Sequence, residues 1–261
     1  METEKITFSF GKNWQNLLKV IDEDSLKRSQ KDLERWFKGR VEIKGKDIID
    51  IGSGSGIHSM MLNAFEPNRL FSFDYDPNSV SATKSMWEKA GSPKNWDVQH
   101  GSVLDKKYMD TLGKYDLVYS WGVLHHTGSM WEAIKNAADL VKPGGHFLIS
   151  IYQGVATYDY DLALKKKYNA AGYLGKKYME WSVYIWPMMK QRRKEGKNPF
   201  GWNEKRMRGM DVYHDIVDWL GGLPYEVADD KQMLDFFAPM GFEMLDKDMS
   251  EACGTYLFKK K

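Results

Sequence analysis

A short apolar run followed by three alternating glycines constrains this chain more than any other feature. Residues Asp47–Ile51 are rich in isoleucine and predict a short buried strand. Gly52, Gly54 and Gly56 then predict a tight turn, and Met60–Leu62 opens a helix. Glycine allows positive φ and, having no Cβ, lets a ligand touch the main chain. Because the first N–H groups of a helix suit an anion or carboxylate, we expect a ligand whose negative end lies over the glycines.

A second strand supplies a carboxylate beside this turn. Leu70–Phe73 is apolar and ends in Asp74, about eighteen residues beyond Gly56. A carboxylate at the tip of the second strand is placed to accept the hydroxyls of a ribose. A nicotinamide site requires its third glycine one residue later, where this chain has Ile57. The glycine spacing therefore disfavours a dehydrogenase.

At this point the chain resembles the class I S-adenosylmethionine-dependent methyltransferases. The matching segments are Asp50–Gly56, Asp74, Tyr115–Ser120 and Leu140–Gly145, in the family's order and at its spacing. The resemblance covers roughly residues 45–152, with a weaker match at 229–260. It implies an α/β fold with a Rossmann-like, doubly wound sheet of seven strands, the last antiparallel. It also implies S-adenosylmethionine as the cofactor.

The resemblance assigns a set of cofactor-binding residues. The glycine turn would hold the methionine moiety, Asp74 the ribose, and the exit of the third strand the adenine. Ser102 stands where the family often has Asp, which leaves the adenine partner open and makes Asp105 the next candidate. The complete expected set is Asp50, Gly52, Ser53, Gly54, Gly56, Asp74, Tyr75, Ser102, Val103, Asp105 and Trp121.

Three histidines are candidates for a catalytic base. His125 and His126 follow the fourth strand, and ligands of parallel sheets sit at the carboxyl ends of the strands. Methyl transfer to a hydroxyl is helped by a base, and an imidazole of near-neutral pKa is the usual one. We expect the two adjacent histidines to differ in role, one supporting the loop and one facing the reacting methyl. His214, beside Asp215 and one turn from Asp218, is the third candidate. The alternative for each is a purely structural role.

The chain departs from the minimal family pattern after its fifth strand. About ninety residues separate Tyr152 from the predicted sixth strand at Gly241–Leu245. This insertion reads as helical, aromatic and basic, and long insertions in compact domains are usually functional. We interpret it as a lid that shapes the acceptor site, with a phosphate-tracking groove or a solvated face as alternatives. The expected divisions are a helical leader at 1–45, a cofactor-binding core at 46–152, the lid at 153–228, and the last helix and strands at 229–261.

One lid segment suggests a substrate class. Residues 206–226 resemble a segment of bacterial small-molecule methyltransferases grouped with the ubiquinone-pathway O-methylases. Arg206 and Arg208 could hold an acceptor carboxylate or phosphate bidentately. Tyr213 and Trp219 complete the expected substrate-binding set. This resemblance favours a small acceptor.

The amino-acid composition limits the disulfides, metal sites and partners that this chain can have. Cys253 is the single cysteine, which excludes an internal disulfide and leaves no cysteine cluster for a metal. The N-terminal residues are polar, and no run approaches the ~18 apolar residues of a membrane span. The net charge of only +2 does not by itself indicate that the protein binds nucleic acid. We expect a soluble cytoplasmic protein with no metal and no membrane partner, and the sequence leaves its oligomeric state open.

The sequence thus predicts a methyltransferase that acts on a small molecule by in-line displacement. Oxygen is the favoured acceptor atom, and a small-molecule nitrogen, which needs no strong base, remains open. A tRNA or other nucleic-acid methyltransferase using the basic lid is the main alternative. A non-catalytic cofactor-binding protein would have the same glycine turn, and the intact cofactor residues argue against it.

Overall fold

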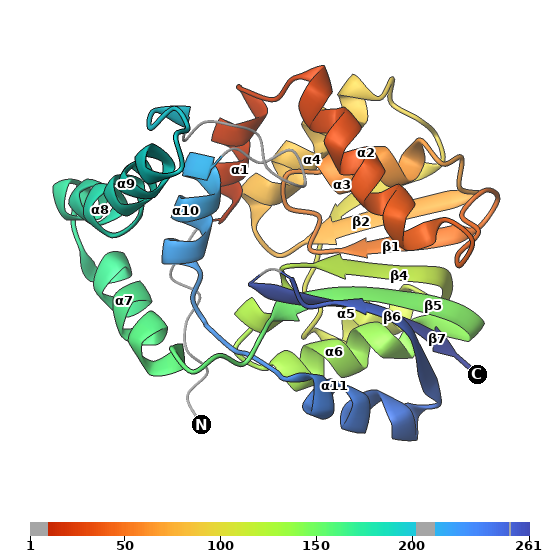
Figure 1. The fold of residues 1–261 in the computed structure, drawn as a ribbon. Coiled ribbons are helices and arrows are strands. Elements are labelled where there is room, and N and C mark those ends of the chain that lie inside the picture. The colour runs from red at the N-terminus through yellow and green to blue at the C-terminus, as the bar shows by residue number, and fades with distance from the viewer. Residues whose placement is uncertain (1–9, 202–211, 251) are drawn as a thin grey trace.

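The computed structural model describes residues 10–201, 212–250 and 252–261, and in these residues seven strands form one sheet (Figure 1). Their order across the sheet is β3-β2-β1-β4-β5-β7-β6. The strands are β1 (Asp47–Ile51), β2 (Arg69–Asp74), β3 (Trp96–His100), β4 (Tyr115–Trp121), β5 (Val141–Tyr152), β6 (Phe242–Asp248) and β7 (Cys253–Lys260). The first five run parallel to one another, whereas β7 is antiparallel to both β5 and β6. The predicted fold class is confirmed, including the antiparallel last strand.

Both faces of the sheet are covered, because alternate residues of each strand point to opposite sides. Ile49 packs in one cluster with α6 and α11, whereas its neighbour Ile48 packs in another with α2 and α3. The helices of these layers are α2 (Glu23–Phe37), α3 (Ile57–Asn63), α4 (Pro77–Lys89), α5 (Lys106–Thr111), α6 (Met130–Asp139) and α11 (Asp230–Phe237). Two short 3₁₀ turns, η1 (Leu124–His126) and η5 (Ala238–Met240), complete this core.

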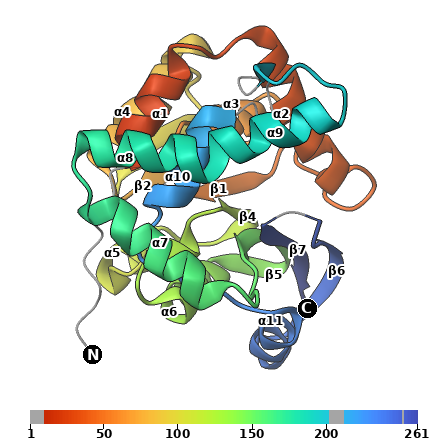
Figure 2. The ribbon, with the colours of Figure 1, turned by 60° about the vertical axis from the view of Figure 1, so that its left-hand side comes forward.

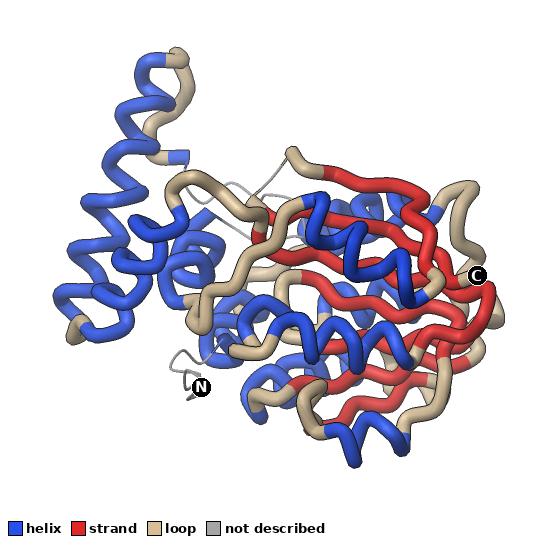
Figure 3. Tube along the Cα trace, turned by 90° about the horizontal axis from the view of Figure 1, so that it is seen from below, coloured by secondary structure: helices blue, strands red, loops and turns tan. Residues whose placement is uncertain are grey.

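The predicted insertion is helical and lies at one end of the molecule. It contains α7 (Tyr158–Ala170), α8 (Tyr173–Met179), the π-helical turn η2 (Glu180–Ile185), α9 (Trp186–Lys194) and α10 (Val212–Gly221). In Figure 1 this lid lies at the end toward which the arrowheads of β1, β2 and β4 point, and Figure 3 shows its helices beyond the strands. The lid therefore faces the carboxyl ends of the parallel strands, where ligands of such sheets bind.

Two helices begin with different kinds of cap. Asp22 caps α2, its side chain accepting the Ser25 N–H at 2.9 Å. Ser129 precedes α6 but makes no capping hydrogen bond, and the Glu226 carboxylate accepts the N–H of Met130, 96 positions away. Helix α6 ends at Asp139, and the Pro-Gly-Gly turn lies within β5. The cap of α2 is local, whereas the Glu226 contact at the start of α6 is tertiary and is not recorded in the local sequence pattern.

No helix in the described part of the chain is both long and apolar enough to cross a membrane.

Candidate active site

The glycine turn leads from β1 into α3 with every glycine in the left-handed region. The φ values of Gly52, Gly54 and Gly56 are 77°, 55° and 77°. A Cβ on Gly56 would lie 2.6 Å from the Cα of Thr83 in α4, so this glycine is required by helix packing as well as by φ. The Ser53 hydroxyl also turns toward α4 and bonds the Thr83 hydroxyl at 2.8 Å. The N–H groups of Gly52, Gly54 and Gly56 already donate to other groups of the protein. The turn would therefore meet a cofactor through its surface without Cβ atoms, and not through the Ser53 side chain.

Asp74 lies against this turn, as the sequence predicted for a ribose ligand. One carboxylate oxygen accepts the Gly54 N–H and the other accepts the Asp76 N–H, both at 2.9 Å. Burial raises the pKa of Asp74 to about 6, although these backbone hydrogen bonds oppose the rise. Next to it Tyr75 is exposed, and its carbonyl lies 2.9 Å from Nε2 of His100. The structure thus brings together two segments that are separate in sequence and both predicted to hold the cofactor.

Asp50 lies beneath the turn in a buried polar chain. Its carboxylate accepts the Ser59 hydroxyl at 2.5 Å, the Ser72 hydroxyl donates to Ser59, and Trp96 Nε1 donates to Ser72. Burial, together with the nearby Asp74 charge, raises the pKa of Asp50 to about 7 against the opposing Ser59 hydrogen bond. The structure therefore assigns Asp50 a role in supporting the strand and helix that carry the glycine turn.

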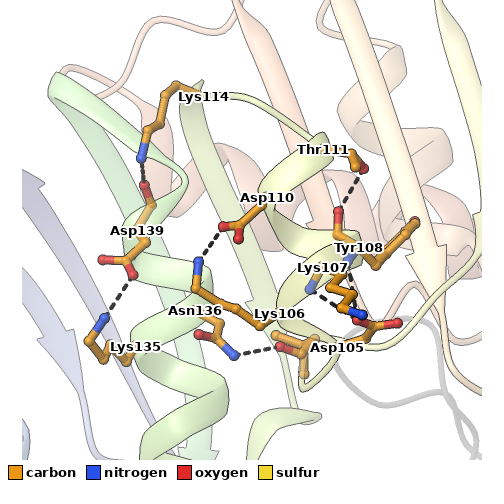
Figure 4. A network of polar contacts seen from close by, with 11 residues as sticks. Asp105, Lys106, Lys107, Tyr108, Asp110, Thr111, Lys114, Lys135, Asn136 and Asp139 are labelled. Carbon is orange, nitrogen blue, oxygen red and sulfur yellow. Dashed lines mark hydrogen bonds and ion pairs between the residues drawn. The ribbon is translucent and has the colours of Figure 1, made fainter.

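The predicted adenine residues form the loop between β3 and α5. Asp105 caps α5 by accepting the Lys107 and Tyr108 N–H groups, as Figure 4 shows. The Ser102 hydroxyl accepts the Leu104 N–H at 3.2 Å, and the Val103 carbonyl accepts the Asn136 amide at 2.9 Å. Both candidate polar side chains thus bind main-chain groups of their own loop, and adenine recognition by either stays a prediction.

The adjacent histidines occupy different environments at the end of β4. His126 is buried, and its Nδ1 lies 2.7 Å from the Pro224 carbonyl. Since a carbonyl only accepts, Nδ1 carries the proton and Nε2 the lone pair. Burial lowers the pKa of His126 to about 3, so the ring is neutral at physiological pH. His125, also buried, accepts the Tyr152 N–H at 3.3 Å, and its carbonyl accepts the Glu226 N–H at 3.1 Å. His125 therefore links its loop to β5 and, through Glu226, to the segment that follows α10.

A leader helix, α1 (Phe10–Leu18), bridges the cofactor side and the histidines. A Cβ on Gly54 would lie 3.1 Å from the indole nitrogen of Trp14, so Trp14 lies directly over the glycine turn. The rings of Phe10 and His126 are 4.9 Å apart, and the Gly11 N–H donates to Asp76 at 3.0 Å. The sequence predicted a helical leader at 1–45 without dividing it. The structure gives its two helices different places, because α1 covers the glycine turn and α2 packs on the sheet.

The lid candidates lie in two places. His214 in α10 accepts the Asn13 amide through its carbonyl at 3.1 Å, and its ring contacts Tyr213 edge to face. The Tyr213 hydroxyl donates to the buried Glu180 at 2.8 Å and also bonds Lys177. Tyr213 and Trp219 both pack against the lid cluster, and Trp219 also packs with Tyr152 at the end of β5. Arg206 and Arg208 lie outside the described residues.

The sequence pattern did not predict that a lysine, Lys165, is buried beside Trp219. Lys165 is fully buried and its ammonium group donates to the Trp219 carbonyl. The same ammonium lies 4.2, 4.7 and 5.2 Å from the ring centroids of Trp219, Tyr225 and Tyr152. Burial lowers its pKa to about 8 against the charges of Asp218 and Asp161. Lys165 belongs to a run of three lysines, and only its position one turn from the buried Tyr168 separates it from the other two.

Tyr152 links this lysine to the histidines. Its ring centroid lies 4.1 Å from that of His125 and 5.3 Å from that of His126. A neutral imidazole with a defined lone pair, aromatic rings and one cation therefore meet at the carboxyl ends of β4 and β5. Among the described residues, no cluster of three or more His, Cys, Asp or Glu side chains could hold a metal ion.

Comparison with known proteins identifies the class. The chain matches the methyltransferase domain family over residues 25–194, and it belongs to that family. A tRNA U34 carboxymethyltransferase of Desulfotalea psychrophila is 25% identical over 136 residues, which are 52% of this chain and 41% of that protein. A ubiquinone biosynthesis O-methyltransferase of Coxiella burnetii is 26% identical over 116 residues, 44% of this chain and 47% of that protein. The chain thus spans less than half the length of these relatives.

Solved structures agree on the fold. The magnesium protoporphyrin IX methyltransferase of Synechocystis, determined with bound SAH, has a TM-score of 0.58 at 12% identity, over 96% of this chain and 94% of that one. The N-methyltransferase NodS of Bradyrhizobium japonicum has a TM-score of 0.51 at 13% identity, over 95% and 98%. The class predicted from the sequence, with S-adenosylmethionine as its cofactor, is confirmed by the family membership. The relatives include a tRNA U34 carboxymethyltransferase and a ubiquinone biosynthesis O-methyltransferase, so they leave the acceptor open.

Proposed function

We propose that this chain transfers the methyl group of S-adenosylmethionine to an oxygen of a small molecule, with His126 accepting the hydroxyl proton. The observation that carries the proposal is the fixed tautomer of His126, whose Nδ1 is held by the Pro224 carbonyl at 2.7 Å. Nε2 is thereby left as an acceptor, at the end of the sheet where the methyl group would lie.

The charge balance of the reaction fits a histidine of low basicity. The acceptor oxygen attacks the methyl carbon, the carbon–sulfur bond breaks, and the sulfonium becomes a neutral thioether. If the hydroxyl proton passes to His126 in that step, one positive charge disappears as another forms. The pKa of about 3 in the free protein therefore does not measure the basicity available during transfer. The proton then leaves to solvent as the products depart.

Lys165 supports an acceptor oxygen that carries or develops negative charge. Its ammonium is buried near Tyr152, whose ring also contacts both histidines. A cation in a poorly solvated site stabilises a nearby anion more strongly than one in water. Aromatic rings around it would suit a planar acceptor, with the predicted Trp219 among them.

A nucleic-acid acceptor is the second candidate, and the basic lid favours it. Part of that charge, however, is used inside the lid: Lys165 is buried, and Lys177 pairs with Glu180 at 2.8 Å. We therefore rank a nucleic-acid acceptor below the small acceptor.

The location of the protein in the cytoplasm stays a prediction.

Transfer of label from S-adenosylmethionine into a cell extract tests the proposal. The purified protein is incubated with labelled cofactor and an extract separated into small metabolites and total RNA, with enzyme-free extract as the control. We expect label in the metabolite fraction, where mass analysis identifies the acceptor. Label confined to RNA would reverse the ranking.

The His126→Ala variant then tests the proton acceptor on the identified substrate. General-base catalysis contributes about 10²–10⁴-fold in rate, so we expect kcat to fall by a factor in this range while cofactor affinity is retained. His125→Ala and His214→Ala are the matched comparisons. Full turnover by all three variants would exclude a histidine base and favour nitrogen as the acceptor.

A further inference from the structure

The outer face of the lid carries a row of large apolar side chains that are each about half exposed or more. Leu174, Tyr178, Trp181 and Trp186 are 80%, 73%, 46% and 54% exposed, and we call them the lid stripe. They lie on α8, η2 and α9, which form one nearly continuous rod across α10 (Figure 2). Contiguous exposed apolar surface of this kind marks an interaction site more often than isolated exposed residues do.

The π-helical turn keeps the lid stripe on one face. Its members are separated by four, three and five residues, and the first two steps match the 3.6-residue α-helical turn. The five-residue step spans η2 (Glu180–Ile185), whose i→i+5 hydrogen bonds accommodate the extra residue. On the opposite side of the same rod, Met179, Glu180 and Ile185 are buried. The rod therefore has two different faces. Its inner face packs against α7 and α10, and its outer face carries the lid stripe.

Basic side chains accompany the lid stripe. Residues 172–201 contain seven Lys or Arg and two Glu, a net charge of +5, whereas the whole chain has +2. One of those glutamates, Glu180, is buried and the other, Glu195, pairs with Lys197 at 2.8 Å. Lys190 lies over the Trp186 ring, 5.4 Å from its centroid. The outer surface of the rod is thus basic as well as aromatic.

We propose that this face docks on an anionic phospholipid bilayer. Trp and Tyr favour the boundary between headgroups and acyl chains, and Lys and Arg are attracted to anionic lipids. A second copy of the chain would bring two faces of net charge +5 together, which disfavours self-association through this surface. Single-stranded nucleic acid is usually held in a groove, whereas the lid stripe lies along the outside of a helix. The proposal departs from the expectation of no membrane partner, which rested on the lack of an apolar span in the sequence. Lying on a bilayer requires no such span.

Vesicle co-sedimentation of the full-length protein tests the proposal. The probes are phosphatidylcholine vesicles, with and without phosphatidylglycerol, at low and at elevated salt. We expect binding to the anionic vesicles that weakens with salt, and at least tenfold weaker binding to the neutral ones.

Two sets of variants separate the apolar from the electrostatic contribution. Leu174→Ser, Trp181→Ser and Trp186→Ser combined should reduce binding to anionic vesicles at least tenfold. Lys190→Gln, Arg193→Gln and Lys194→Gln combined should reduce it without altering the apolar face, and they remain informative if the serine variant fails to fold. Leu234→Ser with Leu245→Ser, in α11 and β6 at the other end of the molecule (Figure 1), is the matched control and should bind as the wild type does.

Four results would overturn the proposal. One is a wild type that stays in the supernatant with anionic vesicles. Another is a folded serine variant that sediments like the wild type. The third is a tRNA mixture bound through the lid stripe by a protein that ignores the vesicles, which would identify the surface as an RNA interface. A stripe-dependent dimer in light scattering, with no vesicle binding, would instead identify a second copy as the partner.

Discussion

Asp50 is the residue whose burial has the clearest consequence for stability. Its pKa rises from 3.8 unfolded to about 7 in the folded chain, so the folded state binds more protons between these values. The free energy of unfolding therefore falls as pH rises from about 4 to 7. Asp50→Asn keeps an oxygen for the Ser59 hydroxyl and removes the titration. Urea unfolding at pH 5 and 7.5 should show a decline smaller in the variant by about 1–3 kcal/mol. Equal declines would contradict the assigned burial.

Asp74 should control cofactor affinity because the Gly54 N–H and the expected ribose both depend on its carboxylate. Hydrogen bonds to charged groups contribute about 1.5–3 kcal/mol, so we expect Asp74→Asn to weaken S-adenosylmethionine binding about 10- to 100-fold. Calorimetric titration measures this, with the exposed Asp97→Asn as the control. Since the pKa of Asp74 is about 6, wild-type affinity should also rise with pH through that value. Unchanged affinity in the variant would remove Asp74 from the site.

At the scale of elements, α1 acts as a cover over the glycine turn. Its indole lies over Gly54 and its first residues contact Asp76 and His126. An aromatic contact contributes about 0.5–1.5 kcal/mol beyond burial, so Trp14→Ala should speed cofactor dissociation up to about tenfold. Stopped-flow displacement of bound cofactor measures this rate. The exposed Lys12→Ala on the same helix is the control, and equal rates for both variants would show that α1 does not cover the bound cofactor.

The lid elements show how tertiary contacts redistribute charge. The sequence grouped Lys165 with Lys166 and Lys167 as one basic run, but the structure buries the first among three rings and leaves the other two exposed. Helical periodicity alone indicates which residues share a face, and only the packing of α7 against α10 and β5 decides which face is inside. A predicted basic surface is therefore reduced by every lysine that the lid buries.

At the scale of the whole molecule, the response to salt separates the two acceptor classes. A protein that contacts many phosphates loses about 10³–10⁵ in affinity between 50 and 200 mM salt. With net charge +2 overall and part of the lid charge paired internally, we expect KM for the small acceptor to change less than threefold over that range. Turnover measured at both salt concentrations tests this. A steep decline would support a nucleic-acid acceptor.

The sequence by itself determined the strand segments along the chain, the glycine turn and the place of Asp74 at the end of the second strand. These depend on short patterns: apolar runs of strand length, glycines at fixed spacing, and a carboxylate at a strand end. Only the tertiary structure decided the tautomer of His126, the placement of Trp14 over Gly54 and the capping of α6 by Glu226. Each of these joins residues 40 to 98 positions apart, and no local pattern records which distant group supplies a carbonyl, an indole or a carboxylate. The physical reason is that a buried polar group takes whichever partner the packing brings to it.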